Sequence, residues 1–204
     1  MPALTLADLV ENRTMSRGMA ATLRKAVAAR RSYLVIALPR LAGKSTTGKA
    51  ILATGPKSMP VRELGADGTD VDELVDQAKG GYLYVPEISR YAVTEGYVWG
   101  APVRKAFAGI ARGTALTTAL HADSVLDALA IVRRNGVPDD DLRRLDVIVH
   151  IRSLGDDWEH PTRRVVVGVH EMVGIRDGEP KTRVLHRWDE AADRFEDVAE
   201  PKRF

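Results

Sequence analysis

Three consecutive residues early in the chain, Gly43, Lys44 and Ser45, have the types that bind a phosphate group. They follow an apolar run and open a stretch with helical character, so we expect them at a strand-to-helix turn. Backbone N–H groups and a helix N-terminus form a concave anion site there. Lys44 would bring positive charge to the β- and γ-phosphates, and the Ser45 hydroxyl would bind Mg²⁺. The predicted phosphate-binding loop consists of Pro39, Arg40, Leu41, Ala42, Gly43, Lys44, Ser45 and Thr46.

This loop departs from the full pattern G-x-x-x-x-G-K-[ST]. The pattern has glycine where Leu38 stands, and many such loops also carry glycine where Leu41 stands. A side chain at these positions restricts φ and narrows the backbone cradle. The alternative interpretation is a helix that begins with Gly-Lys-Ser after a turn and binds no phosphate.

A carboxylate at the end of a second apolar run is the next candidate. Residues 82–85 have the composition of a buried strand, and Pro86 and Glu87 follow them. P-loop enzymes place such an acid beside Mg²⁺ and the attacking water, where it orients or polarises that water. We therefore predict Glu87 as a catalytic residue and, with Ser45, as a metal ligand. The alternative is a surface glutamate at a strand end.

A histidine ends a third apolar run. Residues 114–120 predict a strand, His121 follows it, and Asp123 or Ser124 would cap the next helix. A histidine in this place could hydrogen-bond the γ-phosphate and move when that phosphate is lost. The alternative is a buried neutral histidine paired with the backbone.

The elements that must position these residues follow from hydrophobic patterning. Continuous apolar runs predict strands buried on both faces, and helical segments separate them. Two closing β segments flank a turn at Asp177 and Gly178. Together they predict an α/β fold with a mostly parallel sheet, flanking helices and antiparallel edge strands at the C-terminal end. The expected strands are 33–38, 82–85, 114–120, 146–151, 164–173 and 182–188, with a short strand near Val61, and the expected helices run from Thr14 or Ser16 to Arg30, then 44–53, 71–78, 102–111 and 124–134.

Length and composition indicate one globular domain. The chain has 204 residues, of which 45% are hydrophobic and 28% charged, and we expect a domain over 1–188 and an acidic, solvated tail over 189–204. The absence of cysteine excludes disulfides. With no apolar run of about 18 residues and no signal-like start, we expect no transmembrane segment and a cytoplasmic location. The interspersed charges, with a net charge of +2, do not favour direct nucleic-acid binding.

Taken together, the three motifs resemble the ATPases that power type II secretion, type IV and tight-adherence pili, and type IV secretion. Residues 42–47 are similar to the Walker A loop of that superfamily, 86–89 to its Gly-Glu-[Ile/Val]-Arg motif and 118–124 to its histidine box. Residues 127–129, 145–151 and 164–174 are similar to segments of the tight-adherence branch. The resemblance extends from about residue 5 to about residue 188, with the motifs in the expected order.

This resemblance implies a RecA-like P-loop NTPase fold that binds ATP and Mg²⁺ and forms homo- or hetero-oligomeric rings. It also implies a membrane-bound secretion or pilus platform protein as partner, with the chain peripheral to the inner face of the membrane. Lys44 would bind phosphate, Ser45 would bind Mg²⁺, Glu87 would activate water and His121 would sense the γ-phosphate.

The chain also departs from the family pattern. Only a short lead-in precedes the first strand where the family has an N-terminal domain, and the acidic box is reduced to residues 61–64. Ser89 replaces the motif arginine, although Arg90 follows it; Arg112 and Gly113 stand near the place of the first histidine, and Asp123 replaces asparagine. Two hypotheses remain: an ATP-hydrolysing subunit, or a non-hydrolysing scaffold or regulatory relative that partners an active ATPase. A kinase that uses the same loop is disfavoured, because the sequence has no lid or acceptor-binding signature.

Overall fold

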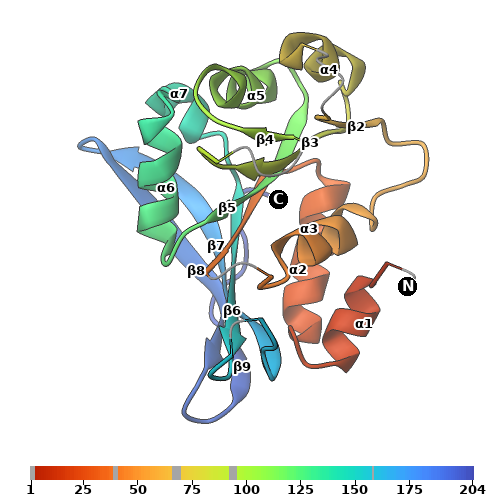
Figure 1. Ribbon diagram of the computed structural model, residues 1–204, viewed down its shortest axis with the longest axis vertical. Helices are drawn as coiled ribbons and strands as arrows, with labels where there is room; N and C mark the ends of the chain where they lie inside the picture. Colours follow the sequence, from red (N-terminus) through yellow and green to blue (C-terminus); the bar gives the residue numbers. More distant parts are fainter. Residues whose placement is uncertain (1–2, 39–40, 66–69, 92–95, 158) are drawn as a thin grey trace.

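The computed structural model describes residues 3–38, 41–65, 70–91, 96–157 and 159–204. Within these ranges nine strands form one sheet in the order β2-β3-β5-β1-β6-β7-β8-β9, and β4 pairs with β3 (Figure 1). The strands are β1 (Tyr33–Leu38), β2 (Val61–Glu63), β3 (Tyr82–Ile88), β4 (Tyr97–Val98), β5 (Ala115–His121), β6 (Val147–Leu154), β7 (Arg163–Arg176), β8 (Glu179–Asp189) and β9 (Arg194–Asp197).

The sheet is parallel from β2 to β6 and antiparallel from β6 to β9. The prediction of a mostly parallel sheet with antiparallel strands at the C-terminal end is confirmed. The hairpin between β7 and β8 turns at Asp177 and Gly178, both with positive φ, as expected. The helices of the described ranges are α1 (Leu6–Glu11), α2 (Arg17–Ala28), α3 (Lys44–Leu52), α4 (Val71–Gln77), α5 (Ala101–Ala111), α6 (Val125–Arg134) and α7 (Asp139–Leu142).

Strand β1 shows why its sequence is apolar throughout. Leu34 and Ile36 point into one buried cluster, whereas Tyr33, Val35 and Ala37 point into a second cluster on the opposite face. Successive side chains of a strand point to opposite faces, so both faces of β1 are covered. Helices α1 to α3 lie on one side of the sheet, and α4 to α7 lie on the other (Figure 1).

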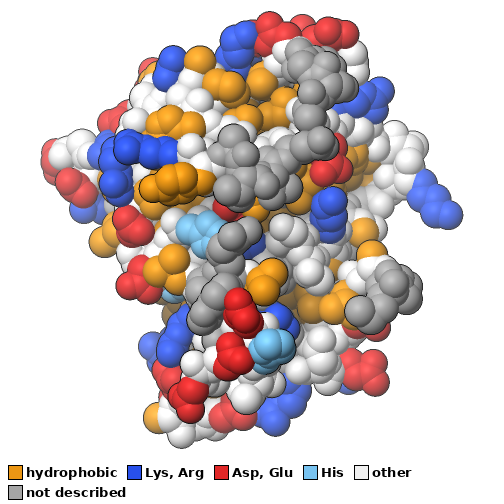
Figure 2. Space-filling model, viewed as in Figure 1, with side chains coloured by type: hydrophobic (Ala, Val, Ile, Leu, Met, Phe, Trp, Pro, Cys, Tyr) orange, Lys and Arg blue, Asp and Glu red, His pale blue; other side chains and the backbone are white. Residues whose placement is uncertain are grey.

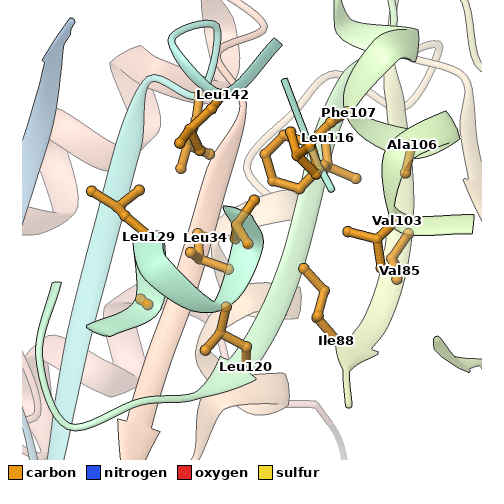
Figure 3. Packing of buried hydrophobic residues seen from close by; sticks show 14 of the residues in the cluster. Leu34, Val85, Ile88, Val103, Ala106, Phe107, Leu116, Leu120, Leu129 and Leu142 are labelled. Carbon is orange, nitrogen blue, oxygen red and sulfur yellow. The ribbon is translucent and has the colours of Figure 1, made fainter. Parts of the chain in front are cut away.

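Figure 3 shows the first cluster, where α5 packs against the sheet. Phe107 and Val103 of α5 lie against Val85 of β3 and Leu116 of β5, and all four are buried. In this way the apolar face of α5 fixes β3 beside β5, the two strands that carry Glu87 and His121.

Helix α3 is held against β1 on the other face. The Tyr33 hydroxyl donates to the Gly48 carbonyl at 2.8 Å, and both residues are buried. Before it, α2 begins after Ser16, whose hydroxyl accepts a hydrogen bond from the Met19 amide. Of the two predicted caps, Ser16 is therefore the one that is used.

The segment after residue 188, expected as an acidic, solvated tail, pairs with the sheet, although none of residues 189–204 is buried. Arg194–Asp197 forms β9 and pairs with β8, and Phe195 and Phe204 pack on the second core cluster. The backbone amides of Lys202 and Arg203 both donate to the buried Glu171 carboxylate, at 2.7 and 2.8 Å. Several of the acidic side chains that suggested solvation pair with arginines of β7, β8 and β9.

The surface agrees with the interspersed charge pattern of the sequence. Figure 2 shows acidic and basic side chains close to one another over much of the face seen in Figure 1. Among the helices of the described ranges, none is both long and apolar enough to cross a membrane.

Candidate nucleotide-binding site

The three predicted site residues come from three adjacent parallel strands. Lys44 follows β1, His121 ends β5, and Glu87 lies near the end of β3, in the sheet order β3-β5-β1. Parallel strands bring their carboxyl ends to one edge of the sheet, and open α/β sheets bind ligands outside that edge. Strand order alone therefore brings these residues together.

A bulge in β3 sets the position of Glu87. Val85 pairs with Thr118 of β5 and Ile88 pairs with Leu120, so Pro86 and Glu87 lie opposite one residue. Proline has no N–H to give to the ladder, and a bulge leaves it unpaired while turning the next side chain. The sequence predicted a strand over residues 82–85 that ends in Pro86 and Glu87, and the observed strand continues through the bulge to Ile88.

Lys44, Glu87 and His121 form a closed triangle. The Lys44 Nζ atom lies 3.4 Å from Glu87 Oε2 and 3.3 and 3.2 Å from the two ring nitrogens of His121. His121 Nε2 lies 3.2 Å from Glu87 Oε1. The side chains of Lys44 and Glu87 are 6% and 4% exposed, whereas that of His121 is 31% exposed. The histidine is thus the member of the triangle with the most contact with solvent.

The pKa of Glu87 reflects opposing effects. Burial alone would raise it, but the hydrogen bond with His121 and the charge of Lys44 outweigh burial and leave the pKa below its ordinary value. Glu87 is therefore ionised at neutral pH. A buried carboxylate held in this way is suited to bind a cation or to accept a proton when its partners leave it.

This pKa leads to a stability prediction. A carboxylate whose pKa is lowered by folding stabilises the protein above its unfolded pKa, and that contribution is lost as pH falls through the folded pKa. From pH 7 to pH 3 the unfolding free energy of the wild type should therefore fall relative to that of Glu87→Gln. Urea unfolding of both proteins at several pH values measures it. A difference that stays constant over this range contradicts the assigned pKa direction.

The loop before α3 combines two left-handed residues. Gly43, the N-cap of α3, has φ 90°, and Leu41 has φ 62°. Glycine adopts this conformation without strain, whereas leucine has a cost on the order of 1 kcal/mol. The Leu41 carbonyl accepts a hydrogen bond from Arg164 Nε of β7 at 2.9 Å, so an antiparallel strand stabilises the strained part of the loop.

A cavity of about 670 Å³ opens at this edge. Such a volume suits a nucleotide-sized ligand. The predicted residues in its wall are Leu41, Ala42, Gly43, Lys44, Ser45, Thr46, Glu87 and His121, while Pro39 and Arg40 lie outside the described residues.

Other lining residues were not predicted as part of the site. They come from the N-terminal lead-in, from α3, from β4 and from the segment that enters β7. The pair Arg163 and Arg164, directly before a run of valines, was the available signal, because it placed two cations at the start of a predicted strand. These unpredicted residues are Leu4, Leu9, Asn12, Thr14, Thr47, Tyr97, Pro161, Thr162, Arg163 and Arg164.

The oxygen donors present fit Mg²⁺, which prefers carboxylate and hydroxyl oxygens and bound phosphate. Ser45 is exposed in the first turn of α3 beside Tyr84, and Glu87 lines the same cavity. Among the described residues, no group of three or more His, Asp or Glu side chains could hold a metal ion alone. Ser45 and Glu87 would need further ligands, such as phosphate oxygens and water.

Two arginines near positions where the sequence departs from the secretion-ATPase motifs have structural contacts. The Arg90 guanidinium lies 4.6 Å from the centre of the Trp99 ring. Arg112, the C-cap of α5, pairs with Asp72 and Asp76, which ties the end of α5 to α4. Arg90 therefore packs on an aromatic ring, and Arg112 forms surface ion pairs.

Comparison with known proteins identifies the fold. No model of a known protein family matches the sequence, and no curated protein matches it. Solved structures do match. The VirB11 ATPase of the Brucella suis type IV secretion system, solved in complex with sulphate, aligns with 83% of the chain at a TM-score of 0.54 and 16% identity. The DotB ATPases of Legionella pneumophila and Yersinia pseudotuberculosis align with 76% and 83% of the chain, at TM-scores of 0.51 and 0.52 and identities of 14% and 12%.

At these identities the likeness establishes a shared fold. The resemblance to secretion ATPases predicted from the motifs is confirmed at that level. The aligned region covers 65% of the VirB11 chain and 48% of each DotB chain, so this protein corresponds to part of those molecules.

Proposed function

We propose that this chain is a RecA-like P-loop domain that binds ATP with Mg²⁺ and hydrolyses it as a subunit of a secretion or pilus-assembly machine. One observation carries the proposal: Lys44, Glu87 and His121 meet within 3.4 Å of one another in the wall of a nucleotide-sized cavity. The shared fold with VirB11 and DotB supports it, and the sulphate in the VirB11 structure is a tetrahedral anion like phosphate. Ring assembly and a membrane-bound partner on the cytoplasmic side remain part of the same proposal.

In this mechanism the phosphates compete with Glu87 for Lys44. The ammonium now pairs with Glu87 Oε2, and an anionic phosphate in the cavity would draw it away. Loss of that positive charge raises the pKa of Glu87, because its burial is then opposed less strongly. Glu87 becomes a better proton acceptor only after nucleotide has bound, and it can then orient and deprotonate the attacking water. Bound Mg²⁺, for which Ser45 and Glu87 are the predicted ligands, would neutralise phosphate charge. A direct bond to Mg²⁺ would keep the Glu87 carboxylate ionised and limit it to orienting the water.

His121 is suited to report the state of the terminal phosphate. Its ring already contacts both Lys44 and Glu87. The side chain is 31% exposed and lines the cavity. A shift of Lys44 toward phosphate changes the partners of this ring. We infer that β5 transmits that change to α6, which Ser124 caps three residues later.

The second candidate function is a non-hydrolysing nucleotide-binding relative that partners an active ATPase. Leu41 favours it, because a strained, 62% exposed leucine occupies a position where many such loops carry glycine. Phosphate release distinguishes the two candidates. Robust turnover by the purified chain excludes the second, whereas nucleotide-dependent stabilisation without release supports it.

Lys44→Ala tests nucleotide binding. A ligand at a hundredfold excess over its dissociation constant stabilises the native state by about 2.7 kcal/mol. We expect Mg-ATP to give the wild type this stabilisation and to give Lys44→Ala almost none, measured by thermal shift and calorimetry. Lys49→Ala is the matched control, because Lys49 lies on the same helix but is exposed and pairs with Glu63.

Because Lys44 is buried beside Glu87, its loss also perturbs the free protein. Ser45→Ala therefore serves as a second variant: Ser45 is exposed, so the fold should be unaffected while Mg-ATP binding weakens. A wild type that shows no stabilisation by Mg-ATP or Mg-ADP rejects the proposed function.

A further inference from the structure

Arg164 is a cation of the cavity wall that the proposed mechanism does not yet use. It lies in β7, 123 residues after Leu41 in the sequence. Nevertheless, its Nε donates to the Leu41 carbonyl at 2.9 Å, and the residue lines the same cavity as Lys44, Glu87 and His121. Only one of the five N–H donors of a guanidinium is used in that bond.

The charges of the cavity wall do not balance. Lys44 pairs with Glu87, and Arg163 pairs with Asp193 at 2.7 Å. Within the described part of the chain, the bond that Arg164 makes goes to a neutral carbonyl, and no ion pair includes it. The side chain is partly buried, so its charge is less well screened than at an exposed site. A wall with one uncompensated guanidinium favours an anion in the cavity.

The stem of Arg164 also fits closely over the loop. A Cβ atom at Gly43 would lie 3.1 Å from Arg164 Cδ, which is a tight contact, and Gly43 already requires glycine for its φ of 90°. Arg164 thus hydrogen-bonds the carbonyl of one left-handed residue of the loop, Leu41, and its stem occupies the space where a side chain at the other, Gly43, would stand. Movement of this side chain would therefore break its hydrogen bond to the loop.

We propose that Arg164 is a phosphate-site arginine: its Nε holds the loop at Leu41, and its remaining N–H groups bind the β- and γ-phosphates of a nucleoside triphosphate. This inference rests on the proposed function and deepens it, because it adds a second cation of the same chain to Lys44. Guanidinium is well suited to the role, since its planar array of donors can bind two phosphate oxygens at once. The ligand class that follows is a nucleoside di- or triphosphate, with weaker binding as phosphates are removed.

Calorimetric titration of the full chain with Mg-ATP, ADP and AMP tests the inference. Arg164→Gln keeps a donor for the Leu41 carbonyl but removes the charge. We expect its affinity for Mg-ATP to fall about tenfold or more, with a smaller loss for ADP and the smallest for AMP. Arg164→Lys keeps the charge and should recover part of the ATP affinity. Arg176→Gln is the matched control, since Arg176 is an exposed arginine at the other end of the same strand, and it should bind ATP as the wild type does.

The results separate the two proposals. If the wild type binds nucleotide, Lys44→Ala does not, and Arg164→Gln binds ATP with wild-type affinity, the inference on Arg164 is wrong and the proposed function stands. An equal loss of affinity for ATP and AMP in Arg164→Gln also overturns it, because a phosphate contact would not act on AMP as strongly. If the wild type binds none of the three nucleotides, both proposals are rejected.

Discussion

Glu87→Gln is expected to bind Mg-ATP about as tightly as the wild type and to hydrolyse it roughly 10²–10⁴ times more slowly. Glutamine preserves the size of the buried side chain and can still hydrogen-bond His121, so the cavity should keep its shape. It cannot take a proton from the attacking water. The same change removes the carboxylate that now holds Lys44, so the ammonium becomes more available to phosphate. Single-turnover phosphate release, together with a binding isotherm for each protein, measures the two effects separately.

Glu63→Gln is the control for this experiment. Glu63 lies in β2, the neighbour of β3, but it is exposed and pairs only weakly with Lys49 at 3.5 Å. We expect its turnover to equal that of the wild type. Equal rates for Glu87→Gln and the wild type would show that Glu87 is not the catalytic acid.

The main strands and helices could be predicted because their signals are local. The apolar run of β1 and the residues of α3 predict a strand and a helix without reference to distant residues. Lys44, Glu87 and His121 were grouped through the resemblance of their three motifs to one family, and the strand order β3-β5-β1 explains why they meet at one edge of the sheet. The short α1 was missed, although Thr5 and Asp8 form a capping box that was present in the sequence.

Contacts between residues far apart in the sequence could not be predicted. The bulge at Pro86 depends on the register of β3 against β5, and Arg164 reaches Leu41 only because β7 runs antiparallel beside β6. Local composition was misleading at the C-terminus. Many acidic residues there suggested solvent, whereas cross-strand pairing and two phenylalanines fix the segment to the domain.

Arg203, in that C-terminal segment, carries the largest expected effect on stability. Its Nε lies 3.2 Å from Asp146 Oδ1, in an ion pair whose alignment falls short of a hydrogen bond, and the Asp146 side chain is 6% exposed. Removing one partner of a buried ion pair costs about 3–5 kcal/mol, because the other charge stays buried. Arg31 is a poor substitute, since its guanidinium lies 4.0 Å away. Arg203 Nη1 also donates to three backbone carbonyls, those of Arg143, Leu145 and Met172.

We therefore expect Arg203→Ala to lower the unfolding free energy by about 3–5 kcal/mol at pH 7, measured by urea unfolding. Burial raises the pKa of Asp146 against the opposing charge of Arg203, so the pKa should rise further in the variant. An acid whose pKa is raised by folding destabilises the protein as pH rises through that pKa. The deficit should consequently shrink as pH falls, and adding Asp146→Asn to Arg203→Ala should recover part of it at pH 7, since the amide can still accept from the Ser32 backbone. The deficit could instead stay the same at low pH and in the double variant. In that case the lost hydrogen bonds to the backbone carbonyls, and not the buried charge of Asp146, would account for the loss of unfolding free energy.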